Sequence, residues 1–380
     1  MASLLLAVIY LAFISLGLPD SLLGAAWPVM HGFFGVPVSF AGLVSMLISG
    51  GTIVSSLMSE RLTRRLGTRY VTLLSVLLTA AAMGGFALSR HFWMLCLWAV
   101  PYGLGAGSID ATLNNYVALH YSARSMSWLH CFWGVGTILS PQVMSRAIAR
   151  YSWQAGYGAV ALIQGCIALV LLLTLPLWRV HPSLGRETQP PLGVKGALGI
   201  RGVKPLLLGF LSYCSLESIC MLWIASFLMA TRGIGPQQAA AFASLFFIGM
   251  TGGRFVSGLV SDRLGDRAMI RLGVLILFVG VGLTAASLPT AWTLTGCVVM
   301  GLGCAPVYPS IIHATPNNFG PENAQAIIGV QMASAYLGST LAPPVFGWVS
   351  TFVGLGTLPL FVGALGIVTI LLLERAFSKQ

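Results

Sequence analysis

The chain has 380 residues, of which 57% are hydrophobic and only 8% are charged, and its formal net charge is +11. A soluble domain carries roughly a quarter charged residues, so this composition excludes an ordinary water-soluble protein. In a soluble chain the surplus of positive charge would suggest a nucleic-acid-binding protein. In a membrane protein the distribution of Lys and Arg over the loops instead indicates how the helices are oriented in the bilayer. We therefore predict a lipid bilayer as the surrounding medium and no nucleic-acid partner.

About a dozen apolar runs follow one another along the chain, each close to the roughly 20 residues that a helix needs to cross a bilayer. Backbone groups in lipid must be paired internally, which leaves helices or closed barrels. The runs are apolar on all sides, whereas barrel strands alternate. The sequence thus predicts an all-α membrane protein with 12 transmembrane helices in two six-helix bundles. The predicted helices are 4–28, 38–59, 70–88, 92–118, 127–149, 155–178, 205–230, 237–260, 269–287, 291–314, 323–348 and 353–374.

The longest polar stretch, residues 179–204, is rich in Pro and Gly. It is predicted to be a cytoplasmic linker between an N-terminal bundle, 1–178, and a C-terminal bundle, 205–380. Cytoplasmic loops of membrane proteins carry an excess of Lys and Arg. Placing the N-terminus in the cytoplasm puts all but five of the 20 Lys and Arg residues on that side, so both termini are expected there. The five exceptions are Arg90, Arg150 and Arg232 on the outer side and Arg146 and Arg254 within helices.

The two halves resemble each other at an offset near 200 residues. Ser59-Glu60-Arg61-Leu62 after the second predicted helix recurs as Ser261-Asp262-Arg263-Leu264 after the eighth. Gly103-Leu104-Gly105 in the fourth helix recurs as Gly301-Leu302-Gly303 in the tenth. Parallel six-helix repeats of this kind are typical of one large group of transporters.

The first predicted helix carries an acid well inside the hydrocarbon. A charged side chain at the bilayer centre costs about 2.5–3.5 kcal/mol, so Asp20 is expected to face a cavity, to pair or to be protonated. A carboxyl group without a partner in an apolar medium holds its proton more tightly, which suits proton coupling. Pro19 frees a backbone carbonyl one turn earlier and lets the helix bend toward a central site. The alternative for Asp20 is a packing hydrogen bond that never titrates.

The fourth and fifth predicted helices add acids, amides and aromatic rings, which suit a sugar because its hydroxyls both donate and accept hydrogen bonds. Asp110 is a second candidate for proton coupling and for substrate binding, and Asn114, one turn later, shares its face. Each aromatic ring has the alternative of anchoring the protein at the lipid interface. The other candidate substrate-binding residues of the first half are Asn115, His130, Gln142, Trp27 and Trp133.

The second half contributes a third acid, Glu217, which lies 197 positions after Asp20 and is also predicted to take part in proton coupling. Local packing against neighbouring serines is its alternative role. Arg146 and Arg254 are the only cations within predicted spans, and each lies toward a helix end, so we expect no cation to neutralise the three acids. Further substrate-binding candidates are Trp223, Tyr308 and Gln331, followed by His313, Asn317 and Asn318, of which the two asparagines have helix capping as an alternative.

Charged residues at the cytoplasmic helix ends have a different expected role. Glu60 and Arg61, together with Asp262 and Arg263, lie at these helix ends. Charge pairs there are expected to hold the two halves together on the inside and to break when the cavity opens inward. The alternative is a signal for membrane insertion, which explains the arginines but not the acids beside them.

The chain resembles the major facilitator superfamily. The loop signature of that family, roughly Gly-x-Leu-x-Asp-Arg-x-Gly-Arg/Lys-Arg/Lys, is similar to Gly258-Leu259-Val260-Ser261-Asp262-Arg263-Leu264-Gly265-Asp266-Arg267, and Glu60-Arg61 belongs to a degraded first copy. Leu18-Pro19-Asp20-Ser21 and Asp110-Ala111-Thr112-Leu113-Asn114-Asn115 resemble the branch of fucose, galactose and glucose proton symporters. The resemblance implies a two-bundle transporter in which Asp20 and Asp110 serve proton coupling and sugar binding.

We therefore predict a secondary active transporter that moves a small polar solute, a hexose-like sugar, by proton-coupled symport through alternating access. Sodium is the alternative coupling ion. A proton-coupled exporter of amphipathic or drug-like molecules and a non-transporting membrane receptor stay open as alternatives. The seven cysteines form no Cys-x-x-Cys pair, and no catalytic constellation stands out, so we predict no enzyme, no metal site and no cofactor. Short loops and missing Asn-x-Ser/Thr sites favour a bacterial inner membrane.

Overall fold

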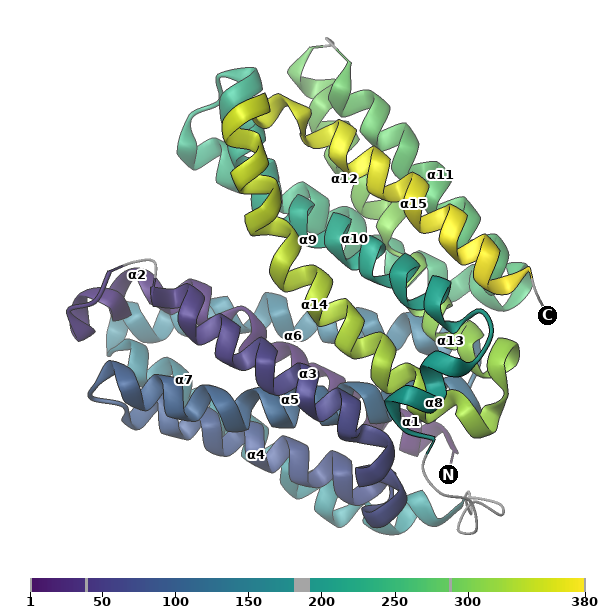
Figure 1. The fold of residues 1–380 in the computed structure, drawn as a ribbon. Coiled ribbons are helices and arrows are strands. Elements are labelled where there is room, and N and C mark those ends of the chain that lie inside the picture. Colours follow the sequence, from purple (N-terminus) through teal and green to yellow (C-terminus); the bar gives the residue numbers. More distant parts are fainter. Residues whose placement is uncertain (1, 38–39, 181–191, 287–288, 379–380) are drawn as a thin grey trace. The chain divides into compact units, whose positions relative to one another are not determined.

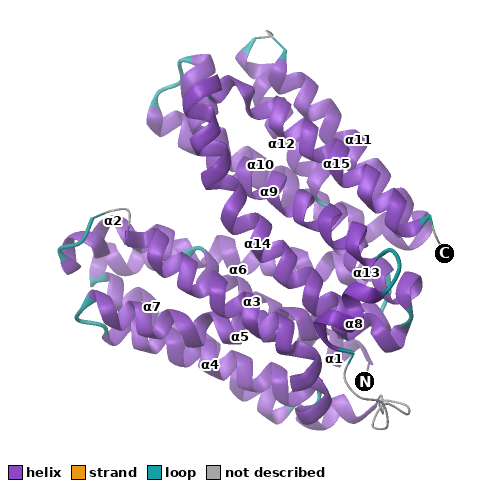
Figure 2. Ribbon diagram, in the orientation of Figure 1, coloured by secondary structure: helices purple, strands orange, loops and turns teal. Residues whose placement is uncertain are grey.

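The computed structural model describes residues 2–37, 40–180, 192–286 and 289–378. Nearly all of these residues lie in helices joined by short loops, and no strand occurs among them (Figure 1, Figure 2). The chain divides into two compact units. The first comprises Met1–Tyr116 with Leu129–Val194, and the second comprises Val117–Trp128 with Lys195–Gln380.

The first half of the chain begins with a divided helix. The predicted span 4–28 is broken at Ser21, and the break follows Pro19, which has no N–H to donate to the preceding turn. The helices of this half are α1 (Ala2–Asp20), α2 (Leu22–Phe34), α3 (Phe40–Leu66), α4 (Thr68–Leu88), α5 (Phe92–His120), α6 (Ala123–Arg150), α7 (Trp153–Leu173) and a short 3-10 helix (Leu175–Val180).

The second half contains another divided span, which was predicted as one helix over 291–314. It is interrupted at Ala305 and Pro306, again where a proline removes a backbone donor. Part of the predicted linker is the short helix α8, and residues 181–191 of that linker lie outside the described residues. The helices are α8 (Gly193–Gly199), α9 (Val203–Arg232), α10 (Pro236–Leu264), α11 (Asp266–Ala285), α12 (Thr290–Cys304), α13 (Val307–Phe319), α14 (Pro321–Val353), a 3-10 turn (Leu355–Thr357) and α15 (Leu358–Phe377).

Ten segments of the described residues are long and apolar enough to cross a membrane. They include Leu4–Trp27, which joins α1 to the start of α2, and Thr290–Phe319, which joins α12 to α13. The two other predicted spans correspond to α6 and α14. These helices have 28 and 33 residues, which is ample length at about 1.5 Å per residue, but their sequences are more polar.

The internal repeat extends to the contacts between helices. In the first unit, a Cβ atom on Gly103 of α5 would collide with the carbonyl oxygen of Ile48 on α3. In the second unit, a Cβ atom on Gly301 of α12 would collide with the carbonyl oxygen of Phe246 on α10. Both members of this second contact lie 198 positions after their counterparts. Backbones approach this closely only at glycine, so the same packing contact occurs in each unit, which supports the predicted repeat.

Gly17 of α1 and Gly136 of α6 mark a similar approach between two helices that carry candidate site residues. A Cβ atom on Gly136 would meet the carbonyl oxygen of Ile14, and one on Gly17 would meet that of Trp133. We expect Gly136→Ala to push the helices apart and to lower the free energy of unfolding by roughly 1–3 kcal/mol, the usual cost of overpacking. Thermal unfolding in detergent measures the loss. Gly24→Ala is the control because a Cβ there meets open space, and equal melting temperatures for the two variants would contradict the close packing.

Candidate functional site

Asp20 is the last residue of α1 and lies within the candidate span Leu4–Trp27, yet it is exposed. Its carboxylate accepts hydrogen bonds from two neutral donors. The Tyr102 hydroxyl of α5 donates to Oδ1 at 2.6 Å, and the indole N–H of Trp133 on α6 donates to Oδ2 at 2.8 Å. Among the described residues, no cation lies within 4.0 Å of this carboxylate. The first acid is therefore oriented by neutral groups alone.

The close approach of α1 and α6 explains how Trp133 reaches Asp20. The turn after Asp20 is fixed to α6 as well, because the Ser21 hydroxyl donates to the carbonyl oxygen of Thr137 at 2.7 Å and lies 2.8 Å from Ser140 Oγ. Tyr102 was not among the predicted site residues. Its sequence signal was its place on α5, about two turns before Asp110.

Asp110, Asn114 and His130 form a second polar cluster, which is buried. The Asn114 amide donates to Asp110 Oδ1 at 2.8 Å, and His130 Nε2 lies 3.0 Å from Asn114 Oδ1. The predicted shared face of Asp110 and Asn114 is confirmed, and His130 extends the chain of hydrogen bonds from α5 to α6. The three residues are only 5%, 0% and 5% exposed, in contrast to Asp20. Asn115, the next residue on α5, is also buried.

Other predicted substrate residues have neighbours outside these two clusters. Trp27 is buried with its ring 6.3 Å from that of Phe92. The Trp223 indole donates to the carbonyl oxygen of Pro343 at 2.9 Å. The remaining ones are Tyr308, whose ring lies 4.8 Å from that of Phe210, Gln331, which accepts a hydrogen bond from Thr315, and Gln142, which is exposed on α6. Trp133 is thus a predicted aromatic platform that the structure joins to a candidate acid.

Glu217 of α9 is paired with a cation, and the expectation that no cation would neutralise it was wrong. Arg254 of α10 donates from Nη2 to Glu217 Oε1 at 3.1 Å, and the two residues are 3% and 8% exposed. The predicted helix ended at residue 260, but α10 continues to Leu264. Arg254 therefore lies about three turns inside the helix, deep enough to meet Glu217.

Asp20 and Glu217 have different surroundings because the residues beside them differ between the two repeats. At the offset of 198 positions, Arg254 corresponds to Ser56 of α3, and Tyr102 corresponds to Met300 of α12. The first unit therefore surrounds Asp20 with neutral donors, while the second unit gives Glu217 a guanidinium group. A proton can bind Asp20 without breaking an ion pair, whereas protonation of Glu217 would leave a buried cation without its counter-charge.

Glu60, a predicted gating residue near the end of α3, holds the end of the linker. It accepts hydrogen bonds from the backbone N–H groups of Leu192 and Gly193, each at 2.8 Å, and lies 3.8 Å from Arg64. Arg61, the gating candidate next to Glu60, is exposed and does not pair with it. Adjacent side chains on a helix point apart, whereas residues four apart share a face.

Asp262, near the end of α10, contacts the segment Val117–Trp128, which joins α5 to α6 and belongs to the second unit. Its carboxylate accepts hydrogen bonds from the backbone N–H of Arg124 at 2.9 Å and from Ser122 Oγ at 3.2 Å. The Arg124 guanidinium lies 3.4 Å away, whereas Arg263, the gating candidate next to Asp262, is exposed and does not pair with it. The acid therefore binds the start of α6 with both its charge and its hydrogen-bond acceptors.

A family model described as Major Facilitator Superfamily matches residues 9–343 and 205–379. The chain belongs to the Major Facilitator Superfamily. It is 24% identical over 365 residues to an uncharacterized MFS-type transporter of Yersinia pestis, with 94% of this chain and 91% of that protein covered. It is also 24% identical over 325 residues to the glucose/mannose transporter GlcP of Bacillus subtilis, covering 81% and 76%.

The superfamily fold is seen directly in a crystal structure of the E. coli fucose:proton symporter FucP. That structure matches this facilitator with a TM-score of 0.78 over 98% of each chain, at 14% identity. The likeness shows the fold alone. The chain is accordingly an integral, multi-pass membrane transporter with the all-helical superfamily fold.

One cluster of this facilitator departs from the loop signature of its superfamily. Asp266 stands where the signature has a basic residue, and its Oδ2 lies 2.8 Å from His313 Nδ1 on α13. His313 Nε2 lies 3.2 Å from the carbonyl oxygen of Tyr121. A carbonyl and an ionised carboxylate can only accept hydrogen bonds. The two bonds therefore require one proton more than a neutral imidazole beside an ionised carboxylate would hold.

This arrangement predicts that the contacts of His313 stabilise residues 117–128 more strongly at low pH than at high pH. Low pH supplies the extra proton and keeps both bonds of His313, and high pH removes one of them. We expect hydrogen exchange in residues 117–128, corrected for intrinsic rates, to be several-fold slower at pH 6 than at pH 8. His313→Gln should remove that difference. Asn318→Ala, on the same helix, should leave it intact, and equal protection at both pH values in the unaltered protein would contradict the interpretation.

Proposed function

We propose that this facilitator is a proton-coupled symporter of a hexose-like sugar that works by alternating access. The observation that carries the proposal is Asp20, an exposed carboxyl group within a span, oriented by a phenol and an indole. Carboxylate and hydroxyl oxygens suit the hydroxyls of a sugar, and an indole face suits its C–H surface. The names of GlcP and FucP, a glucose/mannose transporter and a fucose:proton symporter, support the same solute class.

The proposal divides the work among the three acids. Asp20 takes up the coupling proton, and Asp110 with Asn114 and His130 forms the polar side of the sugar site. Glu217 remains bound to Arg254 and stabilises the second unit. The secondary candidates for the walls of the sugar site are Asn115, Gln142, Trp27, Trp223, Tyr308 and Gln331.

The proposed topology has 12 spans with both termini in the cytoplasm of a bacterial inner membrane, since the cations gather on that side. Asp262 and Glu60 then lie at the cytoplasmic ends of their helices. We assign gating to Asp262, whose bonds to Ser122 and Arg124 would break in the inward-open state. Glu60 keeps the linker in place through the gating cycle.

The energetics are adequate for accumulation. One proton that crosses about 100 mV releases roughly 2.3 kcal/mol. At about 1.4 kcal/mol for each tenfold ratio, this supports a concentration ratio of several tens-fold. Sodium coupling would draw on the same potential, so substitution of sodium for protons in the assay distinguishes the two ions.

Counterflow of labelled D-glucose in proteoliposomes tests the solute class. We expect exchange that unlabelled hexoses suppress and that needs no pH gradient. The absence of hexose exchange, together with acid-dependent efflux of a lipophilic dye, would replace the proposal with an exporter of amphipathic molecules. The absence of both activities in correctly folded protein would favour a membrane receptor.

A further inference from the structure

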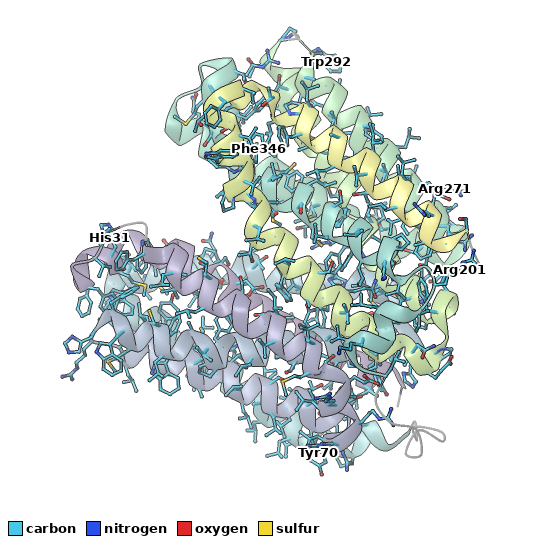
Figure 3. All side chains as sticks on the ribbon, viewed as in Figure 1. His31, Tyr70, Arg201, Arg271, Trp292 and Phe346 are labelled. Carbon is cyan, nitrogen blue, oxygen red and sulfur yellow. The ribbon has the colours of Figure 1, made fainter. Side chains whose placement is uncertain are left out.

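Three cations surround a cavity that the transport mechanism does not use. The cavity has a volume of about 270 Å³ and lies where α8 ends, α9 begins and α15 ends. Arg201 contributes from the turn before α9, Lys204 from the first turn of α9, and Arg375 from the last turn of α15. All three residues are exposed, and Figure 3 labels Arg201 on the side of the second unit where α15 ends.

The cations of this cavity have no acid to balance them. Glu374, next to Arg375, is occupied by Arg271, which donates to its two carboxylate oxygens at 2.6 and 2.8 Å. Within the described part of the chain, no carboxylate lies within 4.0 Å of Arg201, Lys204 or Arg375. Three like charges around one hollow repel each other, so the cavity is suited to an anion with several oxygen acceptors, such as a phosphate group.

Exposed leucines lie one turn from two of these cations. Leu208 follows Lys204 by four residues on α9, and Leu371 precedes Arg375 by four residues on α15. Residues four apart share a helix face. The two leucines are 55% and 65% exposed, and α9 packs directly against α15. Cations around a cavity, with an apolar surface one helical turn away, match a ligand that has an anionic headgroup and hydrocarbon chains.

We propose that this cavity binds the phosphodiester headgroup of an anionic phospholipid, with its acyl chains along Leu208 and Leu371. A free phosphate would use the cations alone and would leave the leucines without a role. Basic pockets between transmembrane helices on the cytoplasmic side are suited to such headgroups. The proposed topology places this end of α15 at the cytoplasmic leaflet, and the site is independent of the transported solute.

Native mass spectrometry of the full chain in detergent, with added phosphatidylglycerol or phosphatidylcholine, tests the proposal. Each cation near a membrane surface contributes about fivefold in affinity. Lys204→Ala/Arg375→Ala is therefore expected to weaken phosphatidylglycerol binding by more than tenfold. The matched control is Arg65→Ala/Arg69→Ala, which removes the same net charge elsewhere and should leave binding unchanged. An equal loss in the control, or equal binding of phosphatidylcholine, would overturn the proposal.

A second pair of variants tests the apolar part of the site. Leu208→Gln/Leu371→Gln keeps all three cations and is expected to weaken phosphatidylglycerol binding several-fold. Unchanged binding in this variant would overturn the lipid assignment. So would displacement of the lipid by glycerol phosphate at equal concentration, because the site would then recognise only a free phosphate.

Discussion

Asp20→Asn is expected to lower proton-driven accumulation of labelled D-glucose at least tenfold, while counterflow without a gradient persists. Asparagine has the shape of aspartate but cannot take up a proton. Its amide nitrogen also cannot accept one of the two hydrogen bonds that Tyr102 and Trp133 donate, so some loss of solute affinity is expected too. Uptake into proteoliposomes with an imposed pH gradient, compared with counterflow in the same vesicles, separates coupling from binding.

Two further variants make this experiment specific. Glu322→Gln removes an exposed carboxyl group from the first turn of α14 and should leave accumulation intact. Asp110→Asn should instead weaken both accumulation and counterflow, because Asp110 is assigned to the sugar site as well. Accumulation at the unaltered level in Asp20→Asn would remove Asp20 as the coupling residue and leave the fold unaffected.

The sequence predicts the positions of the helices well because the apolar runs are long. It predicts breaks within them poorly. The division at Ser21 follows Pro19, and the division before Val307 lies at Pro306, but prolines also occur inside unbroken helices, such as Pro101 in α5. Whether a proline interrupts a helix depends on which neighbouring groups satisfy the freed carbonyl, and that information is not local.

Contacts within one helix are predictable, and contacts between helices are not. Asp110 and Asn114 were placed on one face by their spacing of four residues, and their hydrogen bond follows. The link from Asn114 to His130 and the link from Tyr102 to Asp20 depend on how α5 packs against α6 and α1. No residue spacing within one helix encodes that packing.

The gating residues show the same limit. The sequence identified two acids and the arginine beside each of them as gating candidates, but it did not determine which charges pair. Glu60 meets Arg64, four residues later, and Asp262 meets Arg124, 138 positions away. The first of these partners follows from helical geometry alone. The second partner, Arg124, can be identified only from the tertiary structure.

Arg254→Met is expected to destabilise the protein more than Gly136→Ala or the loss of any surface charge. It leaves the Glu217 carboxylate buried beside no cation, and breaking a buried ion pair from one side typically costs about 3–5 kcal/mol. The double variant Glu217→Gln/Arg254→Met removes both charges and should recover much of the loss, because uncharged side chains of similar volume often replace a buried pair without penalty. Thermal unfolding of the purified protein in detergent gives the melting temperatures of the unaltered protein and the two variants.

The control for this prediction is Arg271→Met, which breaks the ion pair with Glu374 on the exposed surface. That pair has the shorter contacts, 2.6 and 2.8 Å against 3.1 Å, so contact distance alone would make it the more important one. Solvent already screens the exposed charges, so we expect a much smaller fall in melting temperature. A loss in Arg254→Met no larger than in Arg271→Met, or no recovery in the double variant, would show that Arg254 does not act by neutralising Glu217. Glu217 would then return beside Asp20 as a candidate for the coupling proton, because that guanidinium group is what distinguishes the two acids.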